Sequence, residues 1–403
     1  MQPLSIAIVG AGPVGLALAL LAAQQLPRAR VCLFDARPLD RDVASDARTL
    51  ALSLGSIQLL QRLGAWDASR AEPIRQVWVS QQAPALAAPG WLGTPEVRLD
   101  ALDLAVPMLG AVLGYGALVA PMQAQWESVA AREPARLSSR FGTAVTGLKD
   151  LPGGVEVDAG VAERFDLAVV AEGGVFSDRA VADIRHDYLQ NAWVGQVELA
   201  GGTRGLAVER FTRYGPAALL PLPPDAAQPD RLRASLVWCV PQSDDPVREL
   251  DEAQRRAVLA TVFDRRVGRL ESVSPLKCFP LGLAAQKSLV RGRQVRIGNA
   301  AQTLHPVAGQ GLNLGLRDAF VLAAALRNAS QHRSWGLDAA LRRVAWQRAP
   351  DRWAMIAATD FLARSFTWQA PGVATLRGVG MAVLDGIPPL KNALARRMMF
   401  GSR

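Results

Sequence analysis

A glycine-rich segment near the start of the chain has the residue types and spacing of a phosphate-binding turn. It follows an apolar run at residues 4–9 that is typical of a buried parallel strand, and an Ala- and Leu-rich helix is expected after it. Gly10 allows the tight turn, Gly12 allows a pyrophosphate to approach the backbone, and Gly15 allows the helix to pack closely against the strand. The helix N-terminus would offer N–H groups and a positive dipole to the phosphates. The residues expected to bind the cofactor here are Gly10, Ala11, Gly12, Pro13, Val14 and Gly15.

An acidic residue follows the second expected strand at the spacing that dinucleotide-binding proteins use. Residues 30–34 form that strand, and Asp35 comes 20 residues after Gly15, where a carboxylate can bind ribose hydroxyls. Ala36, directly after the acid, is expected to lie beside the same cofactor. Together these features predict a bound dinucleotide. An NAD-dependent dehydrogenase and an FAD enzyme both fit at this point.

Three further segments narrow the choice of cofactor. The first, residues 46–53, contains Arg48 and is expected to open a helix. The second, residues 165–174, has the pattern of a buried strand that ends in an acid and glycines. The third, VRIGNAAQTLHPVAGQGLN at residues 295–313, has the pattern of a strand, a Gly- and Pro-rich turn and the start of an apolar helix.

The third segment resembles the flavin-contacting loop of single-component FAD-dependent aromatic hydroxylases. In that family a strand ends in Gly-Asp, which is Gly298-Asn299 here, and a Pro-x-x-Gly-x-Gly-x-Asn loop follows. The run at 298–318, with ERFT at 209–212 and SLVWC at 235–239, is most similar to the hydroxylases of ubiquinone biosynthesis, and among them to those that act on 2-octaprenyl-6-methoxyphenol. The residues that fit the loop are Pro306, Gly309, Gly311 and Asn313.

The resemblance extends from residue 4 to about residue 385 and implies an FAD-dependent monooxygenase. Its FAD would be reduced by NAD(P)H and would react with O2 to give a C4a-hydroperoxyflavin, which hydroxylates the ring of a polyprenylated phenol in ubiquinone biosynthesis. Such a site must exclude water, and backbone N–H groups of the glycine turn would stabilise negative charge on the reduced flavin. The resemblance adds these cofactor-binding residues: Arg48, Gly298, Asn299, Gly309, Gln310, Gly311, Leu312 and Asn313.

The expected catalytic residues, His305 and Pro306, belong to the same turn. The imidazole of His305 would share a proton with the substrate, and the alternative is a packed histidine that is hydrogen-bonded to the backbone. Tyr214 is the expected substrate contact, with a half-buried strand tyrosine as its alternative, and the alternative for Arg48 is a solvated helix arginine. The sequence contains neither a CxxC pair nor an HExxH motif, so no metal site is expected.

Two departures from the family pattern motivate a second hypothesis. Asn299 stands where the family has an aspartate, and Glu172 likewise replaces the aspartate of the family's Asp-Gly motif. A chain with these changes would be a flavin-binding but catalytically weak scaffold subunit of a ubiquinone-biosynthesis assembly. That hypothesis predicts bound FAD that NAD(P)H reduces poorly, whereas the hydroxylase hypothesis predicts a hydroxylated product.

The order of strand-like and helix-like segments predicts an α/β protein. We expect a discontinuous Rossmann-like FAD-binding domain of the aromatic-hydroxylase type, an inserted and mainly antiparallel β-sheet domain for the substrate, and a C-terminal helical segment. Strand-like runs at 192–199, 217–222 and 233–240 indicate the antiparallel sheet. The expected boundaries are 1–75, 100–182 and 285–335 for the FAD-binding domain, 76–99 and 183–284 for the substrate domain, and 336–403 for the helical segment.

Composition and charge restrict the partners. Half of the 403 residues are hydrophobic, which suffices for a large buried core. The net charge of +9 favours an anionic partner such as lipid headgroups or a phosphate-bearing cofactor, and the scattered arginines argue against nucleic acid. Residues 104–126 carry no charge, but their glycines and prolines predict a buried strand, turn and helix in place of a membrane span.

Residues 388–400 are expected to form an amphipathic helix that begins at a proline. Such a helix would lie on an anionic bilayer, and the alternative is packing against the core. We therefore expect a cytoplasmic protein, either free or peripheral on the inner face of the membrane, with a polyprenylated phenol and other ubiquinone-biosynthesis enzymes as partners. The apolar stripe and the flanking charges of the helix are Leu390, Leu394, Met398, Arg396 and Arg397.

Overall fold

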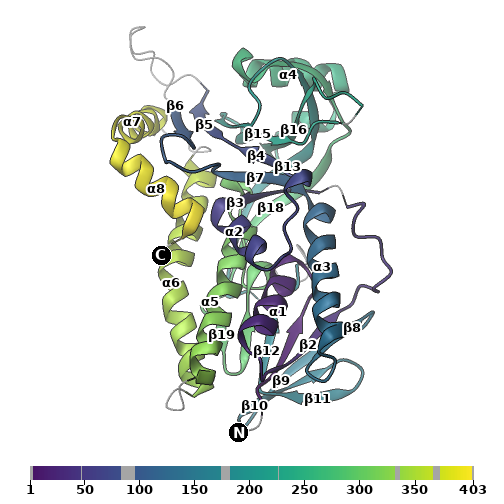
Figure 1. Cartoon of the computed structure of the whole chain (residues 1–403). Helices are drawn as coiled ribbons and strands as arrows, with labels where there is room; N and C mark the ends of the chain where they lie inside the picture. Colours follow the sequence, from purple (N-terminus) through teal and green to yellow (C-terminus); the bar gives the residue numbers. More distant parts are fainter. Residues whose placement is uncertain are drawn as a thin grey trace.

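The computed structural model places two sheets at an angle to each other, with helices packed along and between them (Figure 1). A parallel sheet carries the N-terminal strand, and a larger, mostly antiparallel sheet lies above it in Figure 1. The structure describes residues 3–46, 48–82, 96–173, 182–225, 227–331, 336–365 and 373–401.

The parallel sheet has the strand order β19-β20-β12-β1-β2-β8. The apolar run after the N-terminus forms its central strand β1, which pairs in parallel with β2 and β12 as the run of buried residues predicts. Only β19 runs antiparallel to its neighbour within this described sheet. The bounds are β1 (Ser5–Val9), β2 (Arg30–Asp35), β8 (Leu137–Phe141), β12 (Leu167–Val170), β19 (Val290–Arg291) and β20 (Gln294–Arg296).

The two faces of the parallel sheet are covered differently. Ile6 and Ile8 of β1 point to one face and pack with helices α1, α3 and α5, whereas Ala7 points to the other face and packs with a small antiparallel sheet. This alternation follows from the two-residue period of a strand. The covering elements are α1 (Pro13–Gln25), α3 (Tyr115–Arg132) and α5 (Gly311–Gln331) on one face, and β9 (Gly147–Leu151), β10 (Gly154–Asp158) and β11 (Ala162–Phe165) on the other.

The larger sheet has the strand order β21-β18-β13-β16-β15-β14-β5-β6, with β17 paired to β13. Neighbouring strands are antiparallel except β14 and β5, and the three predicted runs form β13, β15 and β16. The bounds are β5 (Gln76–Gln81), β6 (Glu96–Asp100), β13 (Ile184–Ala200), β14 (Leu206–Phe211), β15 (Pro216–Leu222), β16 (Leu232–Pro241), β17 (Arg269–Val273), β18 (Lys277–Ala285) and β21 (Gln302–Thr303).

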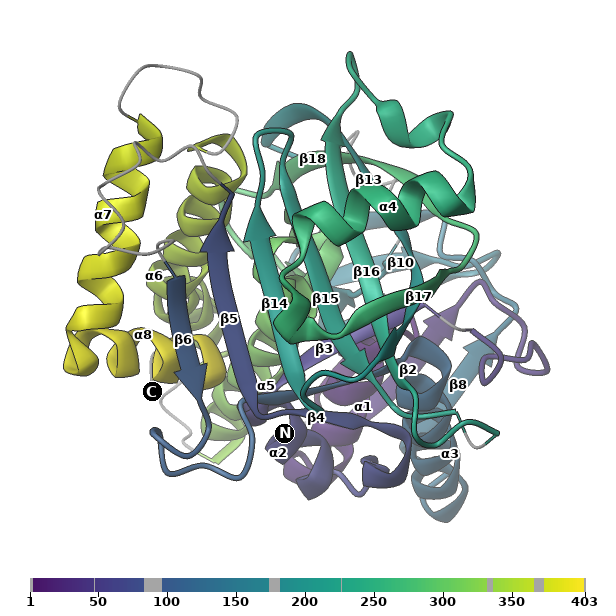
Figure 2. The same cartoon turned by 90° about the horizontal axis from the view of Figure 1, so that it is seen from above.

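Helix α4 (Glu252–Val262) crosses the outer face of the larger sheet (Figure 2) and closes a separate apolar core. Its N-terminus is stabilised by a capping box between Asp251 and Gln254. The inner face turns toward the parallel sheet and meets a third sheet of order β3-β7-β4. The functional division into a cofactor domain and a substrate domain stays a prediction. The bounds of the third sheet are β3 (Thr49–Ser53), β4 (Glu72–Ile74) and β7 (Gly110–Gly114).

The C-terminal segment is helical, as predicted, and runs along one side of both sheets. Helix α7 lies beside the edge strand β6, and α8 packs against α2 and α7 (Figures 1 and 2). Within the described parts of the chain, none of the helices combines the length and the hydrophobicity needed to cross a bilayer. The bounds are α2 (Leu54–Arg62), α6 (Leu337–Ser365), α7 (Val373–Gly386) and α8 (Pro388–Phe400).

Two local expectations can be compared directly with the structure. The uncharged stretch at 104–126 forms strand β7 and most of α3, with Trp126 fully buried, so the buried strand and helix are confirmed, although the helix follows the strand with no turn between them. The segment expected to open a helix at 46–53 is different, because residues 49–53 form β3 and the helix begins only at Leu54. Pairing with β7, about 60 residues away along the chain, determines this strand.

Candidate cofactor and substrate site

The first glycine turn requires glycine at two of its positions. Gly10 has a φ of +105°, and a Cβ there would lie 2.8 Å from the backbone nitrogen of Glu172. A Cβ on Gly15 would lie 1.8 Å from the carbonyl oxygen of Gly10, closer than any contact that side chains make. These two glycines therefore bring α1 against the parallel strands, as the motif predicts.

Gly12 of the same turn faces open space. A Cβ there would have only the hydroxyl of Tyr115 within 4 Å, at 3.8 Å. Gly12 is the N-cap of α1, no acidic residue follows in the first helical turn, and Pro13 opens the helix. The N–H groups of such a turn have no partner inside the helix and attract an anion. The structure thus leaves room for a pyrophosphate, and this cradle fits a dinucleotide.

Asp35 stabilises the first turn from the end of β2. One carboxylate oxygen accepts a hydrogen bond from the backbone N–H of Ala11 (2.5 Å), and the other accepts one from the backbone N–H of Arg37 (2.7 Å). The expected ribose contact of Asp35 stays a prediction, and so does the contact of Ala36, which lies exposed directly after the strand. The carboxylate fixes the backbone beside the open space at Gly12.

Arg48 lies near the cradle, outside any helix. Its side chain is exposed, forms an ion pair with Asp46 (2.7 Å) and covers the ring of Tyr115, with 4.2 Å between its Cζ and the ring centroid. The hydrogen bond with Asp46 raises the pKa of the guanidinium, so it stays charged. Since the Tyr115 hydroxyl faces Gly12, the charge of Arg48 is placed on the side where phosphates would enter.

The start of α1, the Gly298 turn and the first turns of α5 pack against one another. A Cβ on Gly315 would lie 2.7 Å from the Cα of Gly298 and 2.8 Å from a methyl group of Val14. Gly298 itself has a φ of +61° and starts a short 3₁₀ turn that includes the half-buried Asn299. The beginning of α1 therefore touches both the Gly298 turn and the first turns of α5. The helix that follows the turn at residues 306–313 is thus close to the first glycine turn, and the binding of one FAD by both turns stays a prediction.

Asn313 holds the second glycine turn, at residues 306–313, in place through four hydrogen bonds. Its Oδ1 accepts from the backbone N–H of Ser53 and from the hydroxyl of Ser56, both at 2.8 Å. Its Nδ2 donates to the carbonyl oxygens of Ala51 (3.1 Å) and Gly309 (3.0 Å). The side chain is thus saturated and positions the turn against β3. Ser53 and Ser56 were missed by the sequence analysis, because neither belongs to a recognisable motif.

His305 is buried and neutral. Its Nε2 lies 3.1 Å from the side-chain oxygen of Gln190, and its Nδ1 accepts a hydrogen bond from the backbone N–H of Val307 (3.3 Å). Burial lowers the pKa of the imidazole to about 4. Both ring nitrogens have partners inside the protein, and the geometry is that of the packed alternative. Pro306, by contrast, lines the large cavity described below.

The side chains of Tyr214 and Leu312 pack against apolar cores. Tyr214 packs against the apolar core beneath α4, on the outer side of the larger sheet, and its hydroxyl accepts a hydrogen bond from Arg213 (2.5 Å). The side chain of Leu312 packs against the core that contains α1 and α5. Tyr214 lies in the turn between β14 and β15, outside the lining of the large cavity described below, and its expected substrate contact stays a prediction.

A large cavity of about 360 Å³ lies on the inner face of the larger sheet. Its walls are almost entirely apolar and come from three parts of the chain. These are the sheet strands, the second glycine turn and the C-terminal helices. The cavity falls in the range of about 300–1,000 Å³ that small-molecule sites occupy. The main lining residues are Val77, Val79, Leu99, Ala207, Glu209, Phe211, Ala218, Val237 and Cys239 of the sheet, Pro306, Val307, Gly309, Gln310 and Asn313 of the turn and α5, and Met381, Leu384, Lys391, Leu394 and Met398 of α7 and α8.

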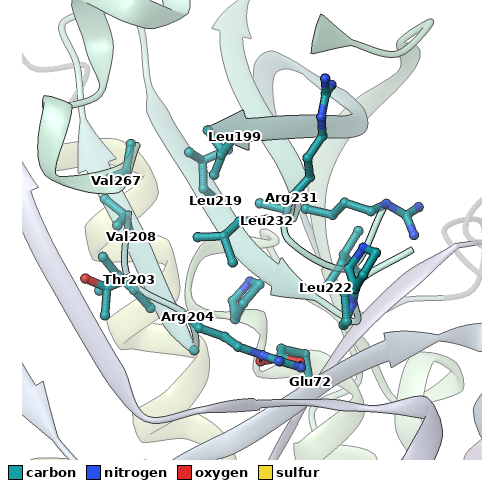
Figure 3. Close-up of a pocket in the computed structure, with 17 residues that line it drawn as sticks. Glu72, Leu199, Thr203, Arg204, Val208, Leu219, Leu222, Arg231, Leu232 and Val267 are labelled. Atoms are coloured by element: carbon teal, nitrogen blue, oxygen red, sulfur yellow. Dashed lines mark hydrogen bonds and ion pairs between the residues drawn. The ribbon is translucent and has the colours of Figure 1, made fainter. Parts of the chain in front are cut away.

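A second hollow, shown in Figure 3, lies at the edge of the core beneath α4 and is much smaller, at about 50 Å³. Leu199, Val208 and Leu219 surround it, and Glu72 and Arg204 form an ion pair of 2.8 Å at its border. An aromatic ring with a prenyl chain needs the larger volume, so the cavity beside the second glycine turn is the candidate substrate site.

Comparison with known proteins gives matches over the whole chain. The FAD binding domain family matches residues 186–359. The 3-demethoxyubiquinol 3-hydroxylase of Escherichia coli (strain K12) is 31% identical, covering 97% of each chain. Ubiquinone hydroxylase UbiL of Rhodospirillum rubrum is also 31% identical, covering 97% of this chain and 88% of its own.

Solved structures of low sequence identity share the fold. Klebsiella pneumoniae HpxO, solved with FAD and uric acid, superposes with a TM-score of 0.71 at 18% identity and covers 100% of this chain and 98% of its own. Pseudomonas aeruginosa PqsL, solved with 2-aminobenzoylacetate, also has a TM-score of 0.71 at 20% identity and covers 94% of this chain and 99% of its own. The α/β architecture expected from the sequence is therefore confirmed.

Proposed function

Because the chain belongs to the family of FAD-dependent hydroxylases of ubiquinone biosynthesis, we propose that it hydroxylates the ring of a polyprenylated phenol, with NAD(P)H and O2 as co-substrates. The observation that carries this proposal is the apolar cavity of about 360 Å³, which is walled on one side by the second glycine turn. A ring held there would lie directly beside the residues expected to contact the flavin.

The residues that would hold FAD come from the two turns. The first turn and the N-terminus of α1 would bind the pyrophosphate, Asp35 the ribose, and Arg48 the outer phosphate oxygens. Backbone groups of Gly309 and Gln310 would face the flavin ring. Bound FAD supplies the redox chemistry, since it accepts reducing equivalents from NAD(P)H and activates O2.

The chain itself positions the ring and excludes water. Apolar side chains of the larger sheet and of α7 and α8 enclose the substrate, which removes bulk solvent from the reacting atoms. Asn313 and His305 keep the second turn rigid from behind, through the backbone contacts of Gly309 and Val307. A fixed turn keeps the distance between ring and cofactor constant, and positioning of this kind contributes strongly to rate.

The test is aerobic incubation of the purified, yellow protein with NAD(P)H and a short-chain prenylphenol. We expect one hydroxylated product for each nicotinamide oxidised, with little hydrogen peroxide released. Bound FAD that NAD(P)H reduces slowly, with no product from any prenylphenol, would instead support the scaffold hypothesis. A colourless protein that oxidises an alcohol with NAD would support the dehydrogenase.

We further propose that α7 and α8 rest on an anionic bilayer. Val379 and Val383 are about half exposed at four-residue spacing on α7, so they form an apolar stripe. Ile387, also about half exposed, lies at the junction of α7 and α8. The same two helices line the cavity with Met381 and Leu394. They therefore cover the cavity on one side and present apolar side chains to the outside on the other. A polyprenyl chain could pass between these two environments without crossing water.

Vesicle flotation tests this membrane contact. Val383→Glu and Ile387→Glu should each reduce binding to vesicles that contain anionic lipid, because a carboxylate in the apolar layer opposes insertion. Val161→Glu is the matched control, since Val161 is also exposed but lies after strand β10, in a sheet far from α7. Equal flotation of all three variants and the wild type would reject the contact. Contacts with other ubiquinone-biosynthesis enzymes stay a prediction.

A further inference from the structure

We propose that Glu209 binds the phenol hydroxyl of the substrate through its carboxylate, an inference that rests on the proposed function. Glu209 is a strand residue of β14, and among the described residues that line the large cavity it is the one acid. The only other charged side chain in that described lining is Lys391, which is paired with Asp385 at 2.9 Å where α7 meets α8.

Strand geometry places the Glu209 side chain on the cavity face of the sheet. Its direct cross-strand neighbours are Val79 on β5 and Ala218 on β15, and both line the cavity. Side chains of directly opposed residues lie on the same face of a sheet. The neighbouring residue Val208 packs into the core beneath α4 on the opposite face. Ala218 is small, so it leaves space above the carboxylate for a ligand.

The strand position of Glu209 is next to residues that touch the second glycine turn. Val79, its neighbour on β5, packs with Phe211 and Val307, and Val307 follows Pro306 in the turn. Phe211 is two residues after Glu209 on the same strand face, a separation of about 6.8 Å. The negative charge of Glu209 contributes to the raised pKa of the Cys239 thiol, which also lines the cavity, although burial is the larger cause. The acid is thus directed into the space that the ring would occupy.

The chemistry of the proposed reaction gives this acid a function. A phenol entering an apolar cavity loses its hydrogen bonds to water, and it binds well only if the protein replaces them. A carboxylate is a strong acceptor, so the O–H of the phenol donates to it without any bond breaking. The hydrogen bond increases electron density on the ring, at the positions ortho and para to the hydroxyl that an electrophilic oxygen attacks. It also selects phenols over their ethers.

Three variants and two ligands test the assignment. Glu209→Leu removes charge and acceptor, Glu209→Gln keeps an acceptor, and Glu198→Gln removes a carboxylate from a surface ion pair outside the cavity. The ligands are a short-chain prenylphenol and its O-methyl ether. For each pair we would measure kcat/KM for ring hydroxylation, the dissociation constant from the change in flavin absorbance, the FAD content and the Tm.

We expect Glu209→Leu to lower kcat/KM and affinity for the phenol about 10- to 100-fold, with Glu209→Gln in between and Glu198→Gln unchanged. The ether should bind weakly to the wild type and should lose nothing further in Glu209→Leu. Equal losses for phenol and ether, or wild-type values in Glu209→Leu, would overturn the assignment. If Glu209→Leu does not retain FAD, the test rests on Glu209→Gln alone. The quantity compared is again the ratio of kcat/KM and of affinity between the phenol and its ether.

Failure of the proposed function gives a different result. If the wild type hydroxylates neither ligand but binds the phenol more tightly than the ether, and Glu209→Leu abolishes that preference, the hydroxyl contact stands and the reaction is wrong. If the wild type hydroxylates the phenol and every Glu209 variant matches it, the reaction stands and the role of Glu209 is wrong.

Discussion

The two glycine turns of the cofactor site are held in place by different means. The first turn, at residues 10–15, depends chiefly on its own backbone, because Gly10 and Gly15 leave no room for a Cβ, and on one carboxylate from the next strand, that of Asp35. The second turn, at residues 306–313, is held by side chains, chiefly those of Asn313 and His305. The first can therefore be recognised from a short local motif. The second depends on partners that are distant in the sequence.

Gly15→Ala should have the largest effect of any change in the two turns. Its Cβ would lie 1.8 Å from the Gly10 carbonyl oxygen, a backbone atom that cannot move without shifting β1 or α1. We expect a loss of more than about 4 kcal/mol in the free energy of unfolding, or failure to fold. Thermal unfolding and the yield of folded protein measure this. Gly380→Ala, in α7 with nothing within 4 Å of its added methyl group, is the matched control.

The pH dependence of the stability tests whether His305, which supports the second turn, is buried and neutral. Its folded pKa of about 4 lies below the unfolded value of 6.5, so the unfolded state takes up a proton first as the pH falls. The part of the stability that depends on His305 should therefore decrease by about 3 kcal/mol between pH 6.5 and pH 4, and that part should not change further below pH 4. His305→Gln should show a shallower decrease over the same window in urea unfolding. Parallel curves would mean that His305 is not the buried, neutral group described here.

Asn313→Ala should weaken the second turn by about 2 kcal/mol. The variant leaves the Ser53 N–H and the carbonyl oxygens of Ala51 and Gly309 without the amide that satisfies them. Because the turn would move relative to β3, we expect a large loss of bound FAD together with only a small decrease in the Tm. Gln61→Ala, at an exposed position of α2, is the control. A normal FAD content in Asn313→Ala would show that the turn keeps its shape without these bonds.

The same contrast explains which parts of the site could be predicted from the sequence. The first part of the site is formed by consecutive segments, namely β1, the first glycine turn, α1 and Asp35 at the end of β2. A short stretch of sequence is therefore enough to predict it. The apolar alternation of β13, β15 and β16 and the proline that starts α8 are local signals as well. The family resemblance located the second turn, but the motif does not specify which side chains support it.

The unpredicted features depend on contacts that join distant segments. Asn313 bonds to Ser53 across a sequence separation of 260 residues, and His305 meets Gln190 across 115. The local pattern at 49–53 predicts the start of a helix, whereas the structure has a strand there, because its partner β7 is far away in the sequence. Tyr214 lies in the turn between β14 and β15, and its packing beneath α4 depends on where this hairpin lies in the larger sheet, which the pattern of one strand does not specify.

Gly12→Ala separates the role of the first turn in folding from its role in binding. A methyl group at this position has only the Tyr115 hydroxyl nearby, at 3.8 Å, so the Tm should stay within about 1 °C of the wild type, since a surface substitution of this kind changes stability little. The methyl group would instead occupy the space in front of the α1 N-terminus. We expect FAD to bind about tenfold more weakly, equivalent to ~1.4 kcal/mol, as measured by titration of the apoprotein.

If Gly12→Ala bound FAD normally, the pyrophosphate would have to lie elsewhere, and the glycines of the first turn would serve only the packing of α1 against the sheet. If it unfolded as Gly15→Ala is expected to, the distinction between a glycine needed for packing and a glycine needed for binding would fail within this turn.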